Sequence, residues 1–448
     1  MSGRTAPASG KWAALADSGF YLAAATVGRG AHLLSVPVLV RLLPAPQFAL
    51  FDTALVLITL LATALLLGTD SGAAARYART RLEDTAALRG IFVASLQVPL
   101  GLGLCAASLM GVLHVVGVLG RLGPTIPWLI VLIAVAIAIG SCVVGLLRWT
   151  TRARSGAFLI GFNGIVPMLV ALGIALEGPA SNQQLLAGFL GGQIVAMSVS
   201  LAFAWRVVGG FGGASSRVRP QALIASSWTL GVASLAAPGR RAVERLLVLG
   251  LLGESALAAY AVLARLAQVL EIALQSLGNG YYPRALRTLD EASGQRLAVL
   301  ALYLFFGATL FAMVVASFAA RPVLMLMGGE MVQLPPNLLL MMLAVGALSA
   351  LPFCAGMAYF HAEKLAHYAG MVLLASLLSL AFGVAAALMV ASLQAWVIGL
   401  LAGHIVAAMV FLRTSERMHA CGYTWGRVLA GLAAIAGLCA VPILVAMV

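Results

Sequence analysis

The stretch LLGESALAAYAVLARLAQVL, residues 251–270, repeats the pattern of an earlier stretch, LLPAPQFALFDTALVLITLL, residues 42–61. Phe51 aligns with Tyr260, and the same offset of 209 residues aligns Asp70 with Asn279. The tetrapeptide GRGA precedes the first copy and GRRA precedes the second. An even number of apolar segments, six, separates the copies, so both point in the same direction. The pattern predicts two lobes related by an axis along the membrane normal, with a substrate path between them. Chance similarity between Leu/Ala-rich helices is the alternative.

The composition around these repeats is that of a membrane protein. Hydrophobic residues make up 62% of the chain, charged residues 9%, and the mean hydropathy is +1.05. No soluble domain of this size hides so much apolar surface, so lipid must be the solvent. Thirteen apolar runs are long enough to span a membrane, at residues 17–41, 47–68, 91–117, 126–147, 157–177, 185–207, 227–252, 257–282, 297–319, 336–359, 368–390, 395–413 and 427–447.

Basic residues fall almost entirely into alternate gaps between the runs. Of the 27 Lys and Arg residues, 19 lie in one set of gaps, three in the other and five inside the runs. Short cytoplasmic loops carry such an excess. Because arginine outnumbers lysine 25 to 2, as is typical of a GC-rich bacterial genome, the predicted location is the bacterial inner (cytoplasmic) membrane. The excess of basic residues in alternate gaps predicts a multi-pass protein with a cytoplasmic N-terminus. This bias also accounts for the net charge of +13, so no nucleic-acid partner is expected.

Motifs of covalent chemistry are missing from the sequence. It contains no GxxxxGK[ST] loop, HExxH pair or GxSxG elbow, and its five cysteines lack CxxC spacing. The chain is therefore predicted not to be an enzyme, with no catalytic residue, no metal site and no cofactor. Coupling to Na⁺ or H⁺ remains open.

Several segments resemble a known family. VPVLVRLLPAPQFALF and GTDSGAAARYAR in the first half, and ERLLVLGLLGESALAAYAVLARLAQVLEIALQSLGNGYYPRAL in the second, look like the polysaccharide-transport branch of the MOP superfamily. So does the turn GMAYFHAEKLAHYAG. This branch contains flippases of O-antigen and other lipid-linked oligosaccharides, and its relatives are lipid II flippases and MATE drug exporters.

The resemblance and the repeat together predict an all-α, polytopic integral membrane protein. It should have about 12–13 transmembrane helices in two pseudo-symmetric six-helix lobes, as in MATE proteins. The predicted parts are an N-terminal lobe at residues 1–210, a cytoplasmic linker at 211–225, a C-terminal lobe at 226–413 and an additional transmembrane helix at 427–447.

Arginines inside the apolar runs are the first candidates for a binding site. A charge at hydrocarbon depth is costly and usually lines a wet cavity or pairs with an acid. Arg29 lies near the middle of the first run, between two glycines and one turn before His32. Its guanidinium suits phosphate oxygens; the alternative is a salt bridge with an acid such as Asp52.

A second group follows Pro238-Gly239, where the helix is expected to kink or break. Glu244 lies within helical reach of both Arg240 and Arg241, and Arg245 comes next. Three cations against one acid suit an anionic head group, whereas an internal cluster of ion pairs is the alternative.

The eighth run carries a polar stripe that should face water or a ligand. Its members stand three or four residues apart, and a buried hydrogen-bond ladder between helices is the alternative. They are Arg265, Gln268, Glu271, Gln275 and Asn279.

The sequence thus predicts a flippase that moves a polyprenyl-diphosphate-linked oligosaccharide to the outer leaflet by alternating access, for cell-surface polysaccharide biosynthesis. The arginines would hold the diphosphate and the amides would meet sugar hydroxyls. Expected partners are this substrate, membrane lipids and the glycan polymerase or glycosyltransferases of the same pathway. A lipid II flippase and a cation-coupled exporter of the MATE type are the alternatives.

Overall fold

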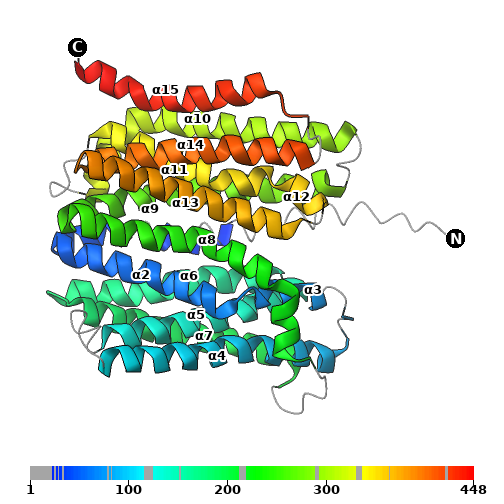
Figure 1. Ribbon diagram of the computed structural model, residues 1–448. Helices are drawn as coiled ribbons and strands as arrows, with labels where there is room; N and C mark the ends of the chain where they lie inside the picture. Colours follow the sequence, from blue (N-terminus) through cyan, green and yellow to red (C-terminus); the bar gives the residue numbers. More distant parts are fainter. Residues whose placement is uncertain are drawn as a thin grey trace. The chain divides into compact units, whose positions relative to one another are not determined.

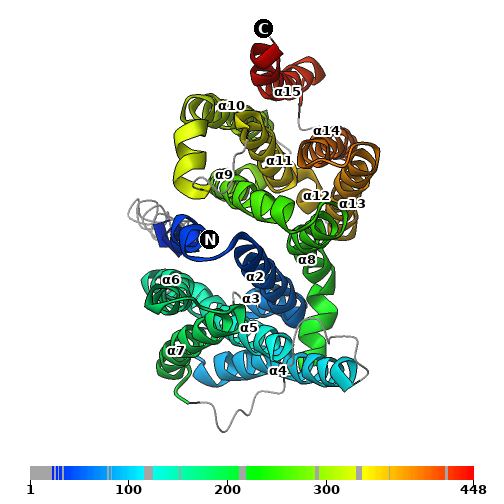
Figure 2. The ribbon, with the colours of Figure 1, turned by 90° about the vertical axis from the view of Figure 1, so that its left-hand side faces the viewer.

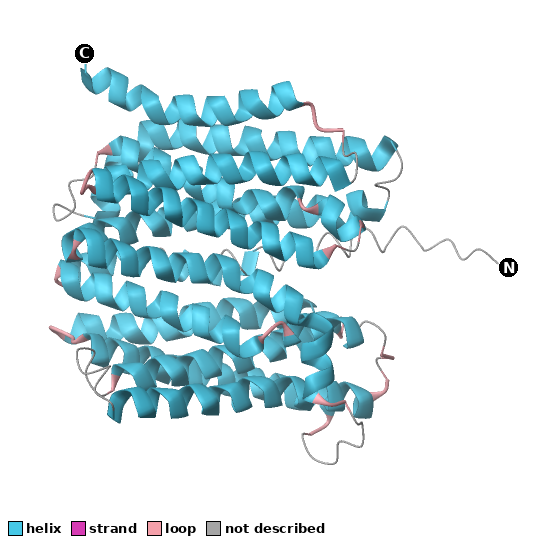
Figure 3. Cartoon of the chain, viewed as in Figure 1, coloured by secondary structure: helices cyan, strands magenta, loops and turns pink. Residues whose placement is uncertain are grey.

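The protein is an assembly of long helices. The structure is a computed structural model that describes residues 23–24, 27–28, 30–32, 35–77, 80–81, 83–115, 125–150, 153–210, 218–287, 292–328, 335–362, 364–418 and 422–447. Within these ranges no strand occurs (Figure 3). The helices, labelled in Figure 1, are α2 (Ala45–Leu66), α3 (Thr69–Tyr77), α4 (Thr85–Val115), α5 (Ile126–Trp149), α6 (Ala153–Glu177), α7 (Asn182–Val208), α8 (Pro220–Leu252), α9 (Glu254–Arg287), α10 (Ala292–Gly328), α11 (Pro336–Ala355), α12 (Met357–His361), α13 (Leu365–Met389), α14 (Leu393–Met418) and α15 (Trp425–Met447). The all-α prediction is confirmed.

The number of spans agrees with the apolar runs. Eleven helices of the described residues are long and apolar enough to cross a membrane, and two shorter apolar helices lie at Gly30–Leu42 and Trp425–Ala440. Each predicted run coincides with one of these thirteen helices, although most of the first run lies outside the described residues. The chain is therefore a multi-pass integral membrane protein.

The internal repeat extends over both halves. Helix α2 begins at Ala45 and α9 begins at Glu254, 209 residues later. The start points of α4 and α10, α5 and α11, α6 and α13, and α7 and α14 are between 207 and 212 residues apart. Phe51 and Tyr260, which the repeat aligns, are both fully buried. The offset of about 209 residues found in one pair of segments thus holds along the chain for five pairs of helices.

The two copies differ where α2 ends. Helix α9 continues to Arg287, whereas the chain after α2 turns through Leu67 and Gly68, with φ angles of 46° and 76°, before α3 begins. A Cβ on Gly68 would lie 2.5 Å from the carbonyl oxygen of Ser227. Both the left-handed backbone and the close approach of α8 therefore require glycine at this position.

Substitution of Gly68 by Ala is expected to destabilise the protein. The left-handed conformation alone costs about 1–2 kcal/mol for a residue with a Cβ, and the clash with Ser227 adds to it. Gly173→Ala is the matched control, because Gly173 is a helical glycine with open space around it. We expect thermal denaturation in detergent to give a lower midpoint for Gly68→Ala and an equal or higher one for Gly173→Ala. Equal midpoints for Gly68→Ala and the parent protein would contradict this reading of the turn.

Two compact units make up the chain. The first comprises residues 1–35 and 61–231, and the second comprises residues 36–60 and 232–448. This grouping differs from the predicted lobes at 1–210 and 226–413, which stay predictions. Helix α8 begins at Pro220, inside the predicted linker.

The first unit is built on the packing of α7. Helices α5 and α6 both lie along α7, and α4 packs on α5 (Figure 2). The start of α7 is fixed by a capping box, in which the backbone N–H of Gln184 donates to Ser181 Oγ at 3.3 Å and Ser181 N–H donates to Gln184 Oε1 at 2.9 Å. Gly209, with φ 68°, ends the helix.

The second unit has α11 at its centre. Most of the span at Pro336–Tyr359 is buried, because α9, α10, α14 and α15 all pack against α11. Helix α13 lies along α14 (Figure 2). This packing holds α9, which carries the predicted polar stripe, against an apolar neighbour on one side.

Candidate functional site: a buried arginine–carboxylate cluster

Asp52 joins three helices of the second unit. Its Oδ2 accepts a hydrogen bond from Arg245 Nε of α8 at 2.8 Å, and its Oδ1 accepts one from Arg265 Nε of α9 at 2.6 Å. Asp52 and Arg245 are almost completely enclosed, whereas the Arg265 side chain is 13% exposed. One carboxylate therefore holds two guanidinium groups, and only one of these reaches the surface of the cluster.

Glu244 has a different pair of partners. It forms a salt bridge with Arg240, one turn earlier on α8, and its other oxygen accepts a hydrogen bond from the Tyr260 hydroxyl at 2.6 Å. All three side chains are buried. This part of the cluster is satisfied internally and links α8 to α9.

Glu271 of α9 is the third acid of the cluster and pairs with Arg241 of α8. Arg241 Nη2 lies 2.7 Å from each carboxylate oxygen of Glu271, and Gln275 Nε2 donates to Glu271 Oε1 at 3.2 Å. Glu271 is 2% exposed, whereas the Arg241 side chain is 22% exposed. Arg241 is thus the most accessible cation of the cluster.

The cluster carries a surplus of positive charge. It contains four arginines and three carboxylates, all in the second unit. Burial of a charge is tolerated when it is paired and hydrogen-bonded, as these acids are. Each glutamate pairs with one arginine, whereas Asp52 holds both Arg245 and Arg265, so the surplus charge belongs to the Asp52 group. Its partly exposed member is Arg265, which suits an anionic ligand.

The predicted residues of α8 and α9 come together, although their pairing differs from the sequence expectation. Arg241 was placed within reach of Glu244 but bonds Glu271 of the next helix. Helix α8 is continuous through Pro238 and Gly239, so the arginines follow regular helical spacing. The proline therefore does not break the helix.

The polar stripe of α9 divides into bonded and unbonded members. Arg265, Glu271 and Gln275 belong to the cluster, and Gln268 lies half-buried between them. The side chain of Asn279 lies outside the described residues, as does Arg29.

The described part of the first run belongs to the first unit up to Ser35 and to the second unit from Val36 on. Its His32 is half-buried, with its ring centroid 6.2 Å from that of Phe189. A Cβ on Gly28 would lie 3.0 Å from the Ile160 carbonyl oxygen, so the backbone of α6 approaches this glycine closely. Asn163 of α6 donates to Ser200 Oγ of α7 at 3.3 Å, so this lone polar residue forms a hydrogen bond between helices.

Two residues of this site escaped the sequence argument. Asp52 was considered only as a possible partner of Arg29, and the structure gives both of its oxygens to Arg245 and Arg265. Tyr260 was noted only as the repeat partner of Phe51, although its hydroxyl holds Glu244. The exchange of a phenylalanine for a tyrosine at equivalent positions, and a lone acid within an apolar run, were the available clues.

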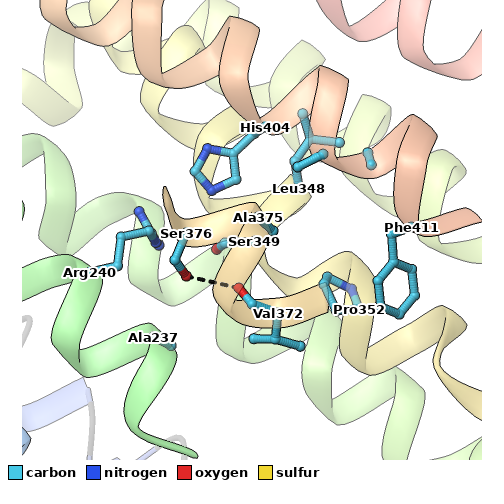
Figure 4. A pocket seen from close by; sticks show the side chains of 12 residues that line it. Ala237, Arg240, Leu348, Ser349, Pro352, Val372, Ala375, Ser376, His404 and Phe411 are labelled. Atoms are coloured by element: carbon cyan, nitrogen blue, oxygen red, sulfur yellow. Dashed lines mark hydrogen bonds between the residues drawn. The ribbon is translucent and has the colours of Figure 1, made fainter. Parts of the chain in front are cut away.

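A small pocket lies beside Arg240, inside the second unit. Figure 4 shows the His404 ring and the Arg240 guanidinium facing it, with Ser376 between them. His404 Nδ1 is bonded to the Leu400 carbonyl oxygen at 2.9 Å, and Ser376 Oγ donates to the Val372 carbonyl oxygen at 3.1 Å. Neither Arg241 nor Arg265 lines this pocket. It is therefore distinct from the accessible edge of the cluster.

Comparison with known proteins identifies the family of the chain. Residues 14–289, more than half of the sequence, match the profile of the family described as "Polysaccharide biosynthesis protein". The chain belongs to this family. Among curated proteins, none matches the sequence significantly.

Solved structures support the fold of this polysaccharide biosynthesis protein. It is similar to the inward-facing conformation of a multidrug resistance MATE family transporter of the MOP superfamily, with a TM-score of 0.62 and 17% identity over 90% of this chain and 96% of that one. The comparison with the outward-facing conformation of a MATE family transporter gives a TM-score of 0.61 and 18% identity, with the same coverage of the two chains. A MATE structure in the bent conformation gives 0.60 and 17%, over 94% and 95% of the two chains. The predicted MATE-like fold and the recognition of the MOP superfamily are confirmed.

Proposed function

We propose that this MOP-type transporter flips a polyprenyl-diphosphate-linked oligosaccharide from the cytoplasmic to the outer leaflet by alternating access. The observation that carries the proposal is the accessible, cationic edge of the buried cluster, in a member of a polysaccharide biosynthesis family. Arg241 and Arg265 are the two cluster cations with exposed surface. A planar guanidinium makes paired hydrogen bonds to phosphate oxygens, and such bonds are strengthened where water is excluded.

Helix α9 also carries side chains that suit the sugars of the ligand. Gln268 and Gln275 stand on the α9 stripe that carries Arg265, and Asn279 continues its spacing. Amides both donate and accept hydrogen bonds, as sugar hydroxyls require. The lipid tail remains in the bilayer, while the site replaces the hydration that the polar head loses in hydrocarbon.

The pairing of the acids argues against a site for organic cations. Such a site requires a carboxylate at membrane depth that is free to meet the ligand. Asp52, Glu244 and Glu271 are each bonded to arginine, and each is about 2% exposed. The exporter alternative of the MATE type therefore finds no support in the described part of the cluster.

The proposal includes the cellular setting. The 19 to 3 division of basic residues supports a cytoplasmic N-terminus, and the excess of arginine over lysine, 25 to 2, suits a bacterial cell and hence its inner membrane. The glycan polymerase or glycosyltransferases that make and extend the substrate are the expected partners, together with membrane lipids.

Depletion of the protein tests the proposal directly. We expect one polyprenyl-linked oligosaccharide to accumulate in the cytoplasmic leaflet, measured by mass spectrometry of lipid extracts and by protection from a membrane-impermeant glycan label. Accumulation of lipid II would instead establish the lipid II alternative. No accumulation, with altered sensitivity to small toxic molecules, would contradict the flippase proposal in favour of an exporter.

Complementation of the depleted cells tests Arg29, whose side chain the sequence places beside the ligand. Arg29→Ala is expected to insert normally and to abolish flipping, and Arg29→Lys to restore it only in part because the fork geometry is lost. Arg41→Ala is the control, because Arg41 is exposed and its bond among the described residues goes to the Pro37 carbonyl of its own helix. Abundant and fully active Arg29→Ala protein would remove Arg29 from the site.

A further inference from the structure

The three acids of the cluster differ in how many cations hold them. Asp52 is bonded to two arginines, Arg245 and Arg265. Glu271 is bonded to one arginine, Arg241, and to the neutral amide of Gln275. The two accessible cations, Arg265 and Arg241, are thus bonded to different carboxylates. Asp52 would keep another arginine if Arg265 moved away, whereas Glu271 would have none if Arg241 moved away.

A diphosphate that reaches the accessible edge competes with these carboxylates. Carboxylate and phosphate oxygens are equivalent acceptors for a guanidinium fork. When Arg265 turns to the ligand, Asp52 keeps its bond to the completely buried Arg245. When Arg241 turns to the ligand, Glu271 keeps only the amide of Gln275. An unpaired carboxylate in a buried site is neutralised by taking up a proton.

We infer that binding of the ligand diphosphate displaces Glu271 from Arg241 and that the freed carboxylate takes up one proton. Glu271 thereby becomes the proton-binding site of the transporter, and this inference rests on the proposed function. Before binding, the Arg241 guanidinium is paired with the Glu271 carboxylate. Afterwards it is paired with a phosphate oxygen, and a new O–H bond on Glu271 holds a proton drawn from solvent. The protein therefore binds one proton for each ligand that it binds.

Among the described side chains, no second cation is bonded to Glu271 to replace Arg241. From α8, Arg240 is within electrostatic range of Glu271, but Glu244 holds it. Three further helices pack on α9, and none of their described side chains is bonded to Glu271. Their ionisable residues are Arg296, Tyr303 and Arg321 of α10, Cys354 of α11, and Tyr359 and His361 of α12.

Calorimetry of ligand binding measures this proton. The full chain in lipid nanodiscs is titrated with a water-soluble short-chain prenyl-diphosphate sugar, in buffers of different ionisation enthalpy at one pH near neutrality. Both phosphates of this probe are diesters and carry no proton that titrates there, so buffer-dependent heat reports protons bound by the protein. We expect uptake of about one proton per ligand.

Glu271→Gln has the shape and charge of the protonated acid. It is expected to bind the probe at least as tightly as the parent protein, with no proton uptake and no dependence of affinity on pH. Glu271→Asp keeps an acid and should keep the uptake, which guards against a variant that fails to fold. Glu254→Gln is the control, because Glu254 is exposed at the start of the same helix, and it should behave as the parent.

The outcomes separate the two proposals. Binding by the parent protein without proton uptake, or equal uptake by Glu271→Gln, would overturn the proton exchange and leave the anionic-ligand site standing. Failure of the parent protein to bind the probe would overturn both. Loss of proton uptake in Glu271→Gln with binding intact is the result that supports the exchange.

Discussion

Asp52→Asn is expected to remove a large fraction of the stability of the protein. The substitution keeps the size of the side chain and removes its charge, so Arg245, whose side chain is 0% exposed, is left in the interior without an acid. Breaking a buried ion pair by removing one partner costs about 3–5 kcal/mol. A folded protein is stable by only about 5–15 kcal/mol. The folded yield in detergent, and the fraction that stays monodisperse after heating, should both fall strongly.

A double variant distinguishes an unpaired charge from simple loss of a contact. Asp52→Asn combined with Arg245→Met removes the acid and the most buried cation together, so it should recover part of the loss. Asp84→Asn is the matched control. Asp84 Oδ1 accepts the backbone N–H of Ala87 at the exposed start of α4, and asparagine preserves that cap. If Asp52→Asn were as stable as the control, the cluster would not be a structural centre of the second unit.

Much of this fold follows from the sequence for a plain physical reason. In lipid every backbone polar group must be satisfied within the helix, so a long apolar run has one regular solution. The run at 126–147 accordingly became α5, Ile126–Trp149. The turn at Gly68 was not predicted, because its cause is the distant backbone of Ser227. Hydropathy contains no information on such an approach.

The sequence predicted which arginines and acids of α8 and α9 belong to the site, but not which ion pairs they form. Arg240, Arg241, Arg245 and Glu244 were found because charge at hydrocarbon depth is rare. Their partners depend on how α2, α8 and α9 pack. Helical spacing of three or four residues predicted that Arg241 pairs with Glu244, whereas in the structure Arg241 pairs with Glu271 of α9. Asp52 lies nearly two hundred residues from Arg245. A single sequence read along one helix at a time does not reveal that bond.

Arg265→Gln is expected to separate transport from folding. Asp52 retains Arg245 when Arg265 is replaced, so the buried acid stays paired and the folded yield should match the parent. The ligand, however, loses a charged donor at the accessible edge. Hydrogen bonds to a charged group contribute about 1.5–3 kcal/mol, so flipping should fall about 10- to 160-fold. The measurement is the initial rate of flipping of a labelled lipid-linked oligosaccharide in proteoliposomes.

Arg265→Lys and Arg296→Gln complete this comparison. Lysine keeps the charge but lacks the planar fork, so it should recover only part of the rate. Arg296 is exposed near the start of α10 and should tolerate glutamine without loss. A fully active Arg265→Gln protein would show that the ligand does not use this arginine. A poorly folded one would show that Arg265, despite its exposed surface, serves Asp52 in the same structural way as Arg245. Because both arginines bond the same carboxylate, opposite defects in Arg265→Gln and Asp52→Asn would assign binding to the exposed edge of the cluster and stability to its interior.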